Sequence, residues 1–284
     1  MDLSNVSAKK RELLSRIEEN ERLGNFDATV EEDPPSKPLL PSEADYLCKR
    51  LSSKIKRRVA NFIADSHFKK MIKKGVFVLE NVEGREHLSA LKKGAIITCN
   101  HFSPFDNYML FHAIRKELPR KYLYKIIKES NYTAFPGLYG FFFRHCNTLP
   151  LSSNRRTMID FMSSVQTLLK RGESILVYPE QEMWWNYRKP RPFKVGGFKL
   201  AYRAGVPVLP MFFTMRDDET RLDGDGYPLQ IHTLHILNPI YPDSSLGEKK
   251  GAEKMMEEAY ALCKAKYEEI YKKPLVFTCD NEKE

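Results

Sequence analysis

The chain has 284 residues, of which 42% are hydrophobic, so it can form one large domain or two small ones, and global disorder is excluded. Its formal net charge of +9 predicts an anionic partner, such as an acidic membrane surface, a nucleic acid or a phosphorylated small molecule. The five cysteines are scattered without a C-x-x-C spacing, which is typical of reduced thiols in a cytoplasmic protein. The charged N-terminal residues do not fit a signal peptide, and no uncharged apolar run is long enough to span a bilayer.

Residues 1–44 are predicted to form a polar leader and a linker that precede the folded domain. The pattern over 4–23 is polar and favours a short helix. The stretch DATVEEDPPSKPLLPSE that follows is acidic and rich in proline, which is typical of an irregular linker.

Residues 45–74 form a second segment with a different composition. Apolar residues recur there at helical spacing, namely Leu47, Leu51, Ile55, Val59, Phe62 and Ile63. Ten Lys or Arg residues lie between positions 49 and 74, against the single acidic residue Asp65. A basic amphipathic helix of this kind can lie in a membrane interface with its lysines near anionic headgroups. It can equally pack on the domain and keep a solvated basic face, and the pattern leaves both interpretations open.

Strand and helix patterns alternate over the remaining residues, 75–284. Strands are predicted over 76–82, 94–100, 122–129, 174–180, 206–215 and 229–237. Helices are predicted over 105–118, 155–172, 196–205 and 248–272, and glycines at 172 and 205 end two of them. This alternation predicts an α/β fold, a single domain with a mixed, mostly parallel sheet flanked by helices, with the amphipathic helical segment on its N-terminal side.

The stretch ITCNHFSPFDNYML places a possible catalytic pair where a strand turns into a helix. Ser103, Pro104 and Asp106 have the spacing of a helix start, with serine at the cap and an acid three residues later. That explanation leaves out His101, which falls between the carboxyl end of a strand and the amino end of a helix, where ligands bind in open α/β sheets. Asp106 could reach back to His101 and orient it as a general base for a hydroxyl.

The segment NHFSPFD resembles the N-H-x-S-x-x-D block of the glycerolipid acyltransferase family, which includes the 1-acylglycerol-3-phosphate acyltransferases. Three further blocks are similar to those of the family and follow in its order. They are FPGLYGFFFRHCNTLPLSSNRRT at 135–157, VYPEQEMW at 177–184 and PFKVGGFKLAYRAGVPVLPM at 192–211. The resemblance covers about residues 75 to 240 and implies the H-x4-D chemistry of that family.

The resemblance implies that His101 is the general base and that Asp106 orients it. The acceptor hydroxyl would attack the thioester of acyl-CoA or acyl-carrier protein directly, which fits a chain with no serine elbow or Cys–His pair. No further cofactor is expected, because the chain has no P-loop and no G-x-G-x-x-G. His112 lies close to the motif, but no ligand spacing predicts a metal site.

The same resemblance implies that Glu180 helps to bind the acceptor, and Lys194, Gly196 and Gly197 match the family segment that follows it. Lys194 and Gly196 are candidate binding residues, but an ordinary surface lysine and close packing at a helix start explain this segment equally well. Two family arginines that commonly bind the acceptor phosphate are missing, since Gln181, Glu182 and Met183 follow Glu180 and Ser152 stands in the second block. Candidate replacements are Arg144, Arg155, Arg156, Arg188 and Arg191. The acceptor is therefore either a lysophospholipid such as 1-acylglycerol-3-phosphate or a lysolipid without a phosphomonoester.

We expect an O-acyltransferase of phospholipid biosynthesis that is cytoplasmic and attached peripherally to an anionic membrane surface. Trp184, Trp185 and Tyr187 lie among polar and basic neighbours, which favours aromatic rings at headgroup depth over core packing. The basic residues of 49–74 could instead bind nucleic acid in a protein without enzymatic activity. No nucleic-acid module or interleaved exposed aromatic residue supports that alternative, so no nucleic-acid partner is expected.

Overall fold

The computed structural model describes residues 6–32, 34–119 and 121–281. Within them, one sheet has the strand order β1-β7-β6-β2-β5-β3-β4. The strands are β1 (Val78–Glu83), β2 (Ala95–Thr98), β3 (Leu123–Ile127), β4 (Thr148–Pro150), β5 (Ser174–Val177), β6 (Val208–Leu222) and β7 (Pro228–Ile236). Neighbouring strands are parallel except β6 and β7, which form an antiparallel hairpin. The prediction of a mixed, mostly parallel sheet is confirmed.

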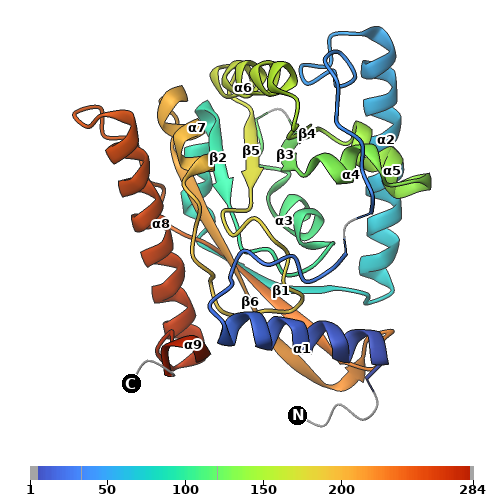
Figure 1. The fold of residues 1–284 in the computed structure, drawn as a ribbon, viewed down its shortest axis with the longest axis vertical. Helices are drawn as coiled ribbons and strands as arrows, with labels where there is room; N and C mark the ends of the chain where they lie inside the picture. The colour runs from blue at the N-terminus through green and yellow to red at the C-terminus, as the bar shows by residue number, and fades with distance from the viewer. Residues whose placement is uncertain (1–5, 33, 120, 282–284) are drawn as a thin grey trace.

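Helices cover both faces of this sheet (Figure 1). They are α1 (Ala8–Arg22), α2 (Leu51–Lys73), α3 (Asp106–Ile114), α4 (Glu129–Thr133), α5 (Gly137–His145), α6 (Arg155–Lys170), α7 (Gly196–Ala204), α8 (Glu248–Tyr271) and α9 (Thr278–Asn281), with a 3-10 helix at Arg85–Lys93. Alternate residues of β2 point to opposite faces of the sheet and pack in two separate hydrophobic clusters. Ile96 packs with residues of α6, α7 and α8, and Ile97 packs with residues of α3 and the 3-10 helix.

Local signals place several of these boundaries. Gly172 and Gly205 follow α6 and α7 with φ of +82° and +65°, the left-handed conformation in which glycine has no Cβ penalty. The side chain of Asn154 caps α6 by accepting from the N–H groups of Arg156 and Thr157. The predicted strands and helices of the α/β part are all present, whereas α4, α5 and β4 lie in a block for which no element was predicted.

The N-terminal leader packs on the domain. Helix α1 was predicted, but its packing against the domain was not. Its residues Leu13 and Ile17 pack against Trp184 and Trp185. The expectation that these tryptophans face a membrane is wrong, since Trp184 is fully buried and its indole N–H donates to the carbonyl oxygen of Ala28 at 3.0 Å. The segment after α1 supplies the apolar partners that a window around residues 184–187 could not reveal.

Helix α2 is present as predicted but begins at Leu51 and turns its larger apolar side chains outward. It packs on α5 through small residues, with Ala60 and Ala64 against Phe142 and Cys146. Leu51, Ile55, Val59, Phe62 and Ile63 are exposed, and Leu51 and Phe62 keep 73% and 75% of their surface. In the described part of the chain, no helix is both long and apolar enough to cross a membrane.

Candidate active site

His101 lies in the turn between β2 and α3, at the carboxyl edge of the parallel strands. Its Nδ1 lies 2.7 Å from Oδ2 of Asp106, the first residue of α3. The His101 side chain keeps 21% of its surface exposed, whereas the Asp106 side chain keeps 1%. The sequence-predicted pair is therefore in contact, with the imidazole open to a ligand and the carboxylate sealed behind it.

Asp106 also orders the turn that carries His101. Its Oδ2 accepts the backbone N–H groups of Phe102 and Ser103 at 3.1 and 3.2 Å. The bond to Ser103 is the reach-back contact of a capping box, although the α-helix begins at Asp106, three residues after the serine predicted as its cap. One carboxylate therefore caps the turn and also contacts the imidazole, while the catalytic role of the pair stays a prediction.

The hydrogen bonds also assign the tautomer of His101. Asp106 accepts from three N–H or O–H donors besides the imidazole, so it is the ionised carboxylate that satisfies them. An ionised carboxylate can only accept, which assigns the proton of neutral His101 to Nδ1. The Nε2 atom is then left with its lone pair and can accept a proton.

Tyr178 is a site residue that the sequence analysis did not single out. Its hydroxyl donates to Oδ1 of Asp106 at 2.5 Å, and its ring stacks on the His101 imidazole with centroids 3.9 Å apart at 11°. Burial, followed by the nearby charge of Asp106, raises its pKa well above the usual value of 10.0. The sequence signal that could have identified Tyr178 is its position one residue after β5. Thr98 at the end of β2 pairs with Val177 at the end of β5, so the residues that follow the two strands lie close together.

Glu180 lies beside His101, but its carboxylate has protein partners. Oε2 accepts the N–H of His101 at 3.3 Å and contacts Nη2 of Arg191 at 3.2 Å, and Oε1 accepts the N–H of Arg191 at 3.0 Å. Burial raises the pKa of Glu180, and Arg191 acts against that rise. Glu180 therefore ties the turn of His101 to residue 191, and its predicted role in binding the acceptor stays a prediction.

Lys194, Gly196 and Gly197 lie at the start of α7. Lys194 forms an ion pair of 2.5 Å with Asp27 of the leader. A Cβ on Gly196 would meet no atom within 4 Å, whereas one on Gly197 would lie 2.9 Å from a methyl group of Val177. Gly197 thus allows α7 to approach β5, and the binding roles of Lys194 and Gly196 stay predictions.

The structure does not bring the candidate arginines of the second block to His101. Arg144 donates to the carbonyl oxygen of Phe135 and lines a polar cavity of about 160 Å³ at the opposite ends of β3 and β4. Arg155 and Arg156 are exposed in the first turn of α6. Arg188 is paired with Asp217. A cation that the sequence analysis missed is Lys128, which follows β3 and forms an ion pair of 2.7 Å with Glu182.

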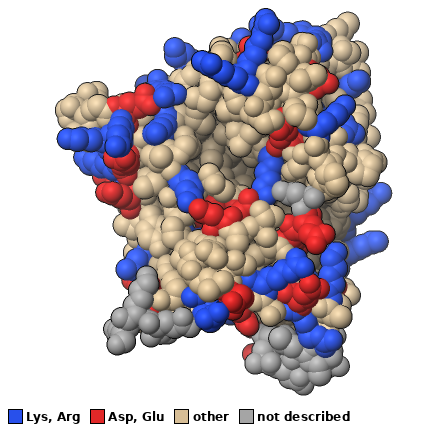
Figure 2. All heavy atoms as spheres, in the orientation of Figure 1, with Lys and Arg blue, Asp and Glu red and all other residues tan. Residues whose placement is uncertain are grey.

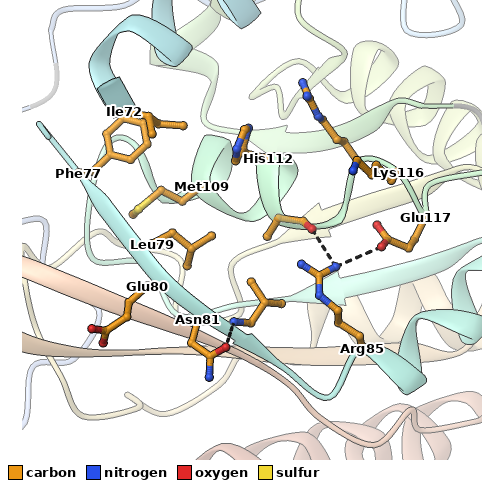
Figure 3. Close-up of a pocket in the computed structure, with 13 residues that line it drawn as sticks. Ile72, Phe77, Leu79, Glu80, Asn81, Arg85, Met109, His112, Lys116 and Glu117 are labelled. Carbon is orange, nitrogen blue, oxygen red and sulfur yellow. Dashed lines mark hydrogen bonds and ion pairs between the residues drawn. The ribbon is translucent and has the colours of Figure 1, made fainter. Parts of the chain in front are cut away.

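A larger cavity, of about 630 Å³, lies away from the catalytic pair between β1, α3 and the end of α2 (Figure 3). Its floor is apolar, and its rim carries the ion pair of Arg85 with Glu117. The face that carries the carboxyl ends of β2 and β5 is hollowed near its centre, with basic and acidic side chains around the hollow (Figure 2). Among the described residues, no group of three or more His, Cys, Asp or Glu side chains is placed to hold a metal ion.

Comparisons with known proteins agree with the motif blocks. A family model described as Acyltransferase matches residues 80–214. A chloroplastic 1-acyl-sn-glycerol-3-phosphate acyltransferase of Brassica napus is 27% identical over 136 residues, which are 48% of this chain and 37% of that protein. Another 1-acyl-sn-glycerol-3-phosphate acyltransferase, from Chlamydomonas reinhardtii, is 28% identical over 135 residues, which are 48% of this chain and 38% of that protein. The match thus spans little more than a third of these relatives.

The fold has a solved counterpart over almost its whole length. The crystal structure of PlsC, the 1-acyl-sn-glycerophosphate acyltransferase of Thermotoga maritima, superposes with a TM-score of 0.53 and 20% identity. The superposition covers 94% of this chain and 99% of that one, which shows a shared fold. The residues that the family model matches include His101, Asp106 and Glu180, and with the relatives they support an assignment to the glycerolipid acyltransferase family, which includes the 1-acylglycerol-3-phosphate acyltransferases.

Proposed function

We propose that this protein transfers a fatty acyl group from an acyl thioester, acyl-CoA or acyl-carrier protein, to the hydroxyl of a lysophospholipid such as 1-acylglycerol-3-phosphate. The observation that carries the proposal is the contact of 2.7 Å between His101 Nδ1 and Asp106 Oδ2. It leaves the exposed Nε2 as the proton acceptor at the ligand-binding edge of the sheet. The names of the relatives support the choice of acceptor.

The reaction needs one proton acceptor and no covalent intermediate. Nε2 of His101 takes the proton of the acceptor hydroxyl while the hydroxyl oxygen attacks the thioester carbonyl carbon. The imidazolium is stabilised by Asp106. When the tetrahedral intermediate collapses, the C–S bond breaks and the leaving thiolate takes the proton back from His101. The products are the acylated lipid and the free thiol of the donor.

Direct transfer is supported by the state of the nearest cysteine. Cys99 lies two residues before His101 and is buried. Burial, with a further contribution from the charge of Asp106, raises its pKa well above the usual value of 9.0. A buried neutral thiol is a poor nucleophile, so the acceptor hydroxyl is the better candidate for attack on the thioester.

The second part of the proposal is peripheral attachment to an anionic membrane through α2. The exposed side chains Leu51, Ile55, Val59, Phe62 and Ile63 share one side of this helix, opposite the side that packs on α5. Lys and Arg residues border them along the helix. This combination suits an interfacial helix, in which apolar side chains enter the acyl boundary and lysines contact anionic headgroups.

Helix α5 extends the same surface. Leu138 and Tyr139 are each 42% exposed, and the Tyr139 hydroxyl lies 3.3 Å from Nε2 of His67 on α2. A surface with so many apolar side chains favours lipid over nucleic acid, whose phosphates are bound by basic and polar groups. A membrane site would also supply the lysophospholipid acceptor at its own surface.

A lysolipid without a phosphomonoester is a second candidate acceptor. Arg144, Arg155 and Arg156 lie away from His101, and Arg188 and Arg191 are paired with acidic residues. The fork of an arginine, which suits a phosphate dianion, is therefore not offered by the arginines that the sequence analysis considered. Lys128 and Lys194 are likewise paired, with Glu182 and Asp27.

The test is acyl transfer from acyl-CoA and acyl-carrier protein to a panel of lysolipids, with His101→Ala beside the wild type. We expect 1-acylglycerol-3-phosphate to be acylated and His101→Ala to lose activity by about 10²- to 10⁴-fold or more. Tyr271→Phe, a change on α8, is the control for a general effect of substitution. Acylation of only other lysolipids would select the second acceptor. Equal activity of His101→Ala and the wild type would refute the proposed chemistry.

A further inference from the structure

We propose that Tyr178 is a positioning residue for the His101–Asp106 pair: its hydroxyl holds the Asp106 carboxylate and its ring holds the plane of the imidazole. This inference rests on the proposed acyl transfer, in which His101 is the base. Tyr178 lies on the segment after β5, while His101 lies in the turn after β2 and Asp106 begins α3. It therefore joins two neighbouring strand ends at the reacting group.

The hydroxyl of Tyr178 completes the environment of Asp106. Oδ2 accepts from His101 Nδ1 and from the two backbone N–H groups of Phe102 and Ser103. Oδ1 accepts from Tyr178 at 2.5 Å, and no other donor to Oδ1 is present among the described residues. With both oxygens held, the carboxylate cannot rotate about its last bond without breaking a charge-assisted hydrogen bond.

The ring of Tyr178 fixes the imidazole from its face. The ring centroids are 3.9 Å apart and the planes differ by 11°, which is an aromatic stack. Asp106 anchors only the Nδ1 edge of His101, so a hydrogen bond by itself would let the ring swing about that contact. Stacking removes this freedom and points Nε2 toward the acceptor, and small errors in such an orientation lower rates strongly.

Other charged or titratable groups around the pair do not replace Tyr178. Cys99, the residue after β2, is buried, and burial raises the pKa of its thiol. Burial lowers the pKa of His232 on β7 to about 4, so the His232 imidazole stays neutral. Glu180 faces the backbone of His101 and is paired with Arg191. The raised pKa of the Tyr178 phenol keeps it protonated, so it remains a donor throughout the pH range of the reaction.

The hydroxyl also moderates the basicity of the pair. A donor on Oδ1 draws charge from Asp106 and weakens the support that Asp106 gives to the imidazolium. Removal of the donor concentrates that charge on Oδ2, which stabilises protonated His101. His101 then holds its proton to higher pH, and a larger fraction of the base is blocked at neutral pH.

The experiment compares Tyr178→Phe with the wild type in the full chain. We expect kcat for acyl transfer to fall by about 10- to 100-fold with little change in KM, because the ring remains and the substrate contacts are untouched. The acid limb of the kcat/KM profile should move to higher pH by about half a unit. Tyr271→Phe removes another part-buried tyrosine hydroxyl, which bonds to the backbone of Met215, and should change neither quantity.

A measurement without turnover separates this inference from the proposed function. The seven histidines can be isotopically labelled, and loss of one signal in His101→Gln assigns His101 in NMR spectra. The titration midpoint of that signal should be higher in Tyr178→Phe, whether or not a lysolipid is acylated. Fluorotyrosine at position 178 keeps the ring and is a stronger hydrogen-bond donor, so it should lower the titration midpoint of the His101 signal. This variant provides the test if Tyr178→Phe does not fold. An unchanged midpoint and pH profile would overturn the inference.

Discussion

Glu180 and Arg191 form an ion pair whose side chains are 2% and 0% exposed, with 3.2 Å between Oε2 and Nη2. The guanidinium also donates to the carbonyl oxygens of Phe26 and Glu182 and lies over the ring of Trp184. The pair therefore joins the turn of His101, the segment after β5 and the N-terminal leader. Its position explains why a leader outside the family match is packed against the site.

Breaking this pair should cost stability. Arg191→Met leaves the Glu180 carboxylate buried without its cation, and we expect the free energy of unfolding to fall by about 3–5 kcal/mol. Glu180→Gln should lower the free energy of unfolding by a similar amount, because it leaves the Arg191 guanidinium buried without its anion. Urea unfolding of both variants and of the double variant measures the coupling. The double variant should lose clearly less than the sum of the two, and additive losses would contradict a direct pair.

Asp106→Asn should separate the two tasks of Asp106. The amide keeps the size of the carboxylate but replaces one acceptor oxygen by an NH₂ group. That group faces N–H or O–H donors, which come from the backbone of the turn, from His101 and from Tyr178. We expect acyl transfer to fall by about 10⁴-fold because the neutral imidazole loses its assigned tautomer. Thermal unfolding should show a smaller loss of stability than Asp106→Ala, which leaves all four donors to Asp106 unpaired. Equal activity of Asp106→Asn and the wild type would argue against orientation of His101.

The apolar side of α2 should control membrane binding. Phe62→Asp places a charge where the helix would enter the lipid, and we expect binding to anionic vesicles to weaken by about 10-fold or more. The melting temperature should stay nearly unchanged because Phe62 is 75% exposed. Vesicle sedimentation measures the binding. Ser244→Asp adds the same charge at an exposed position four residues before α8 and is the matched control. Helix α8 lies on the opposite side of the molecule from α2 (Figure 1).

Glu21 should make the attachment of the leader depend on pH. Burial would raise its pKa, but hydrogen bonds from Lys189, the N–H of Thr278 and Tyr187 outweigh burial, so its pKa lies below the usual value of 4.5. A lowered carboxyl pKa stabilises the fold above the unfolded-state value, and this stabilisation disappears as the pH falls through the folded-state value.

We therefore expect Glu21→Gln to cost about 2 kcal/mol at pH 7 and progressively less as the pH falls below 4.5. Urea unfolding of both proteins across this range measures the difference, and fluorescence of Trp184 and Trp185 reports on the leader that covers them. A difference between the two proteins that is independent of pH would show that the charge of Glu21 is not responsible.

The sequence alone determined the features that depend on short spans of chain. The alternation of apolar runs and helical patterns predicted the strands and helices of the α/β sheet, because each period is set within one element. His101 and Asp106 were found together for the same reason, since four residues separate them and one carboxylate can serve both a helix start and an imidazole.

Only the tertiary structure decided which side chains meet across elements. The stack of Tyr178 on His101 depends on β5 lying beside β2, and the burial of Trp184 depends on α1, more than 150 residues away. The partners of Glu180 were likewise not predictable from the sequence. The exposure of one side of α2 was not predictable either, because a helical pattern identifies an apolar side without saying whether protein covers it. These contacts come from the packing of distant segments, whose choice is made by the whole core and not by any local pattern.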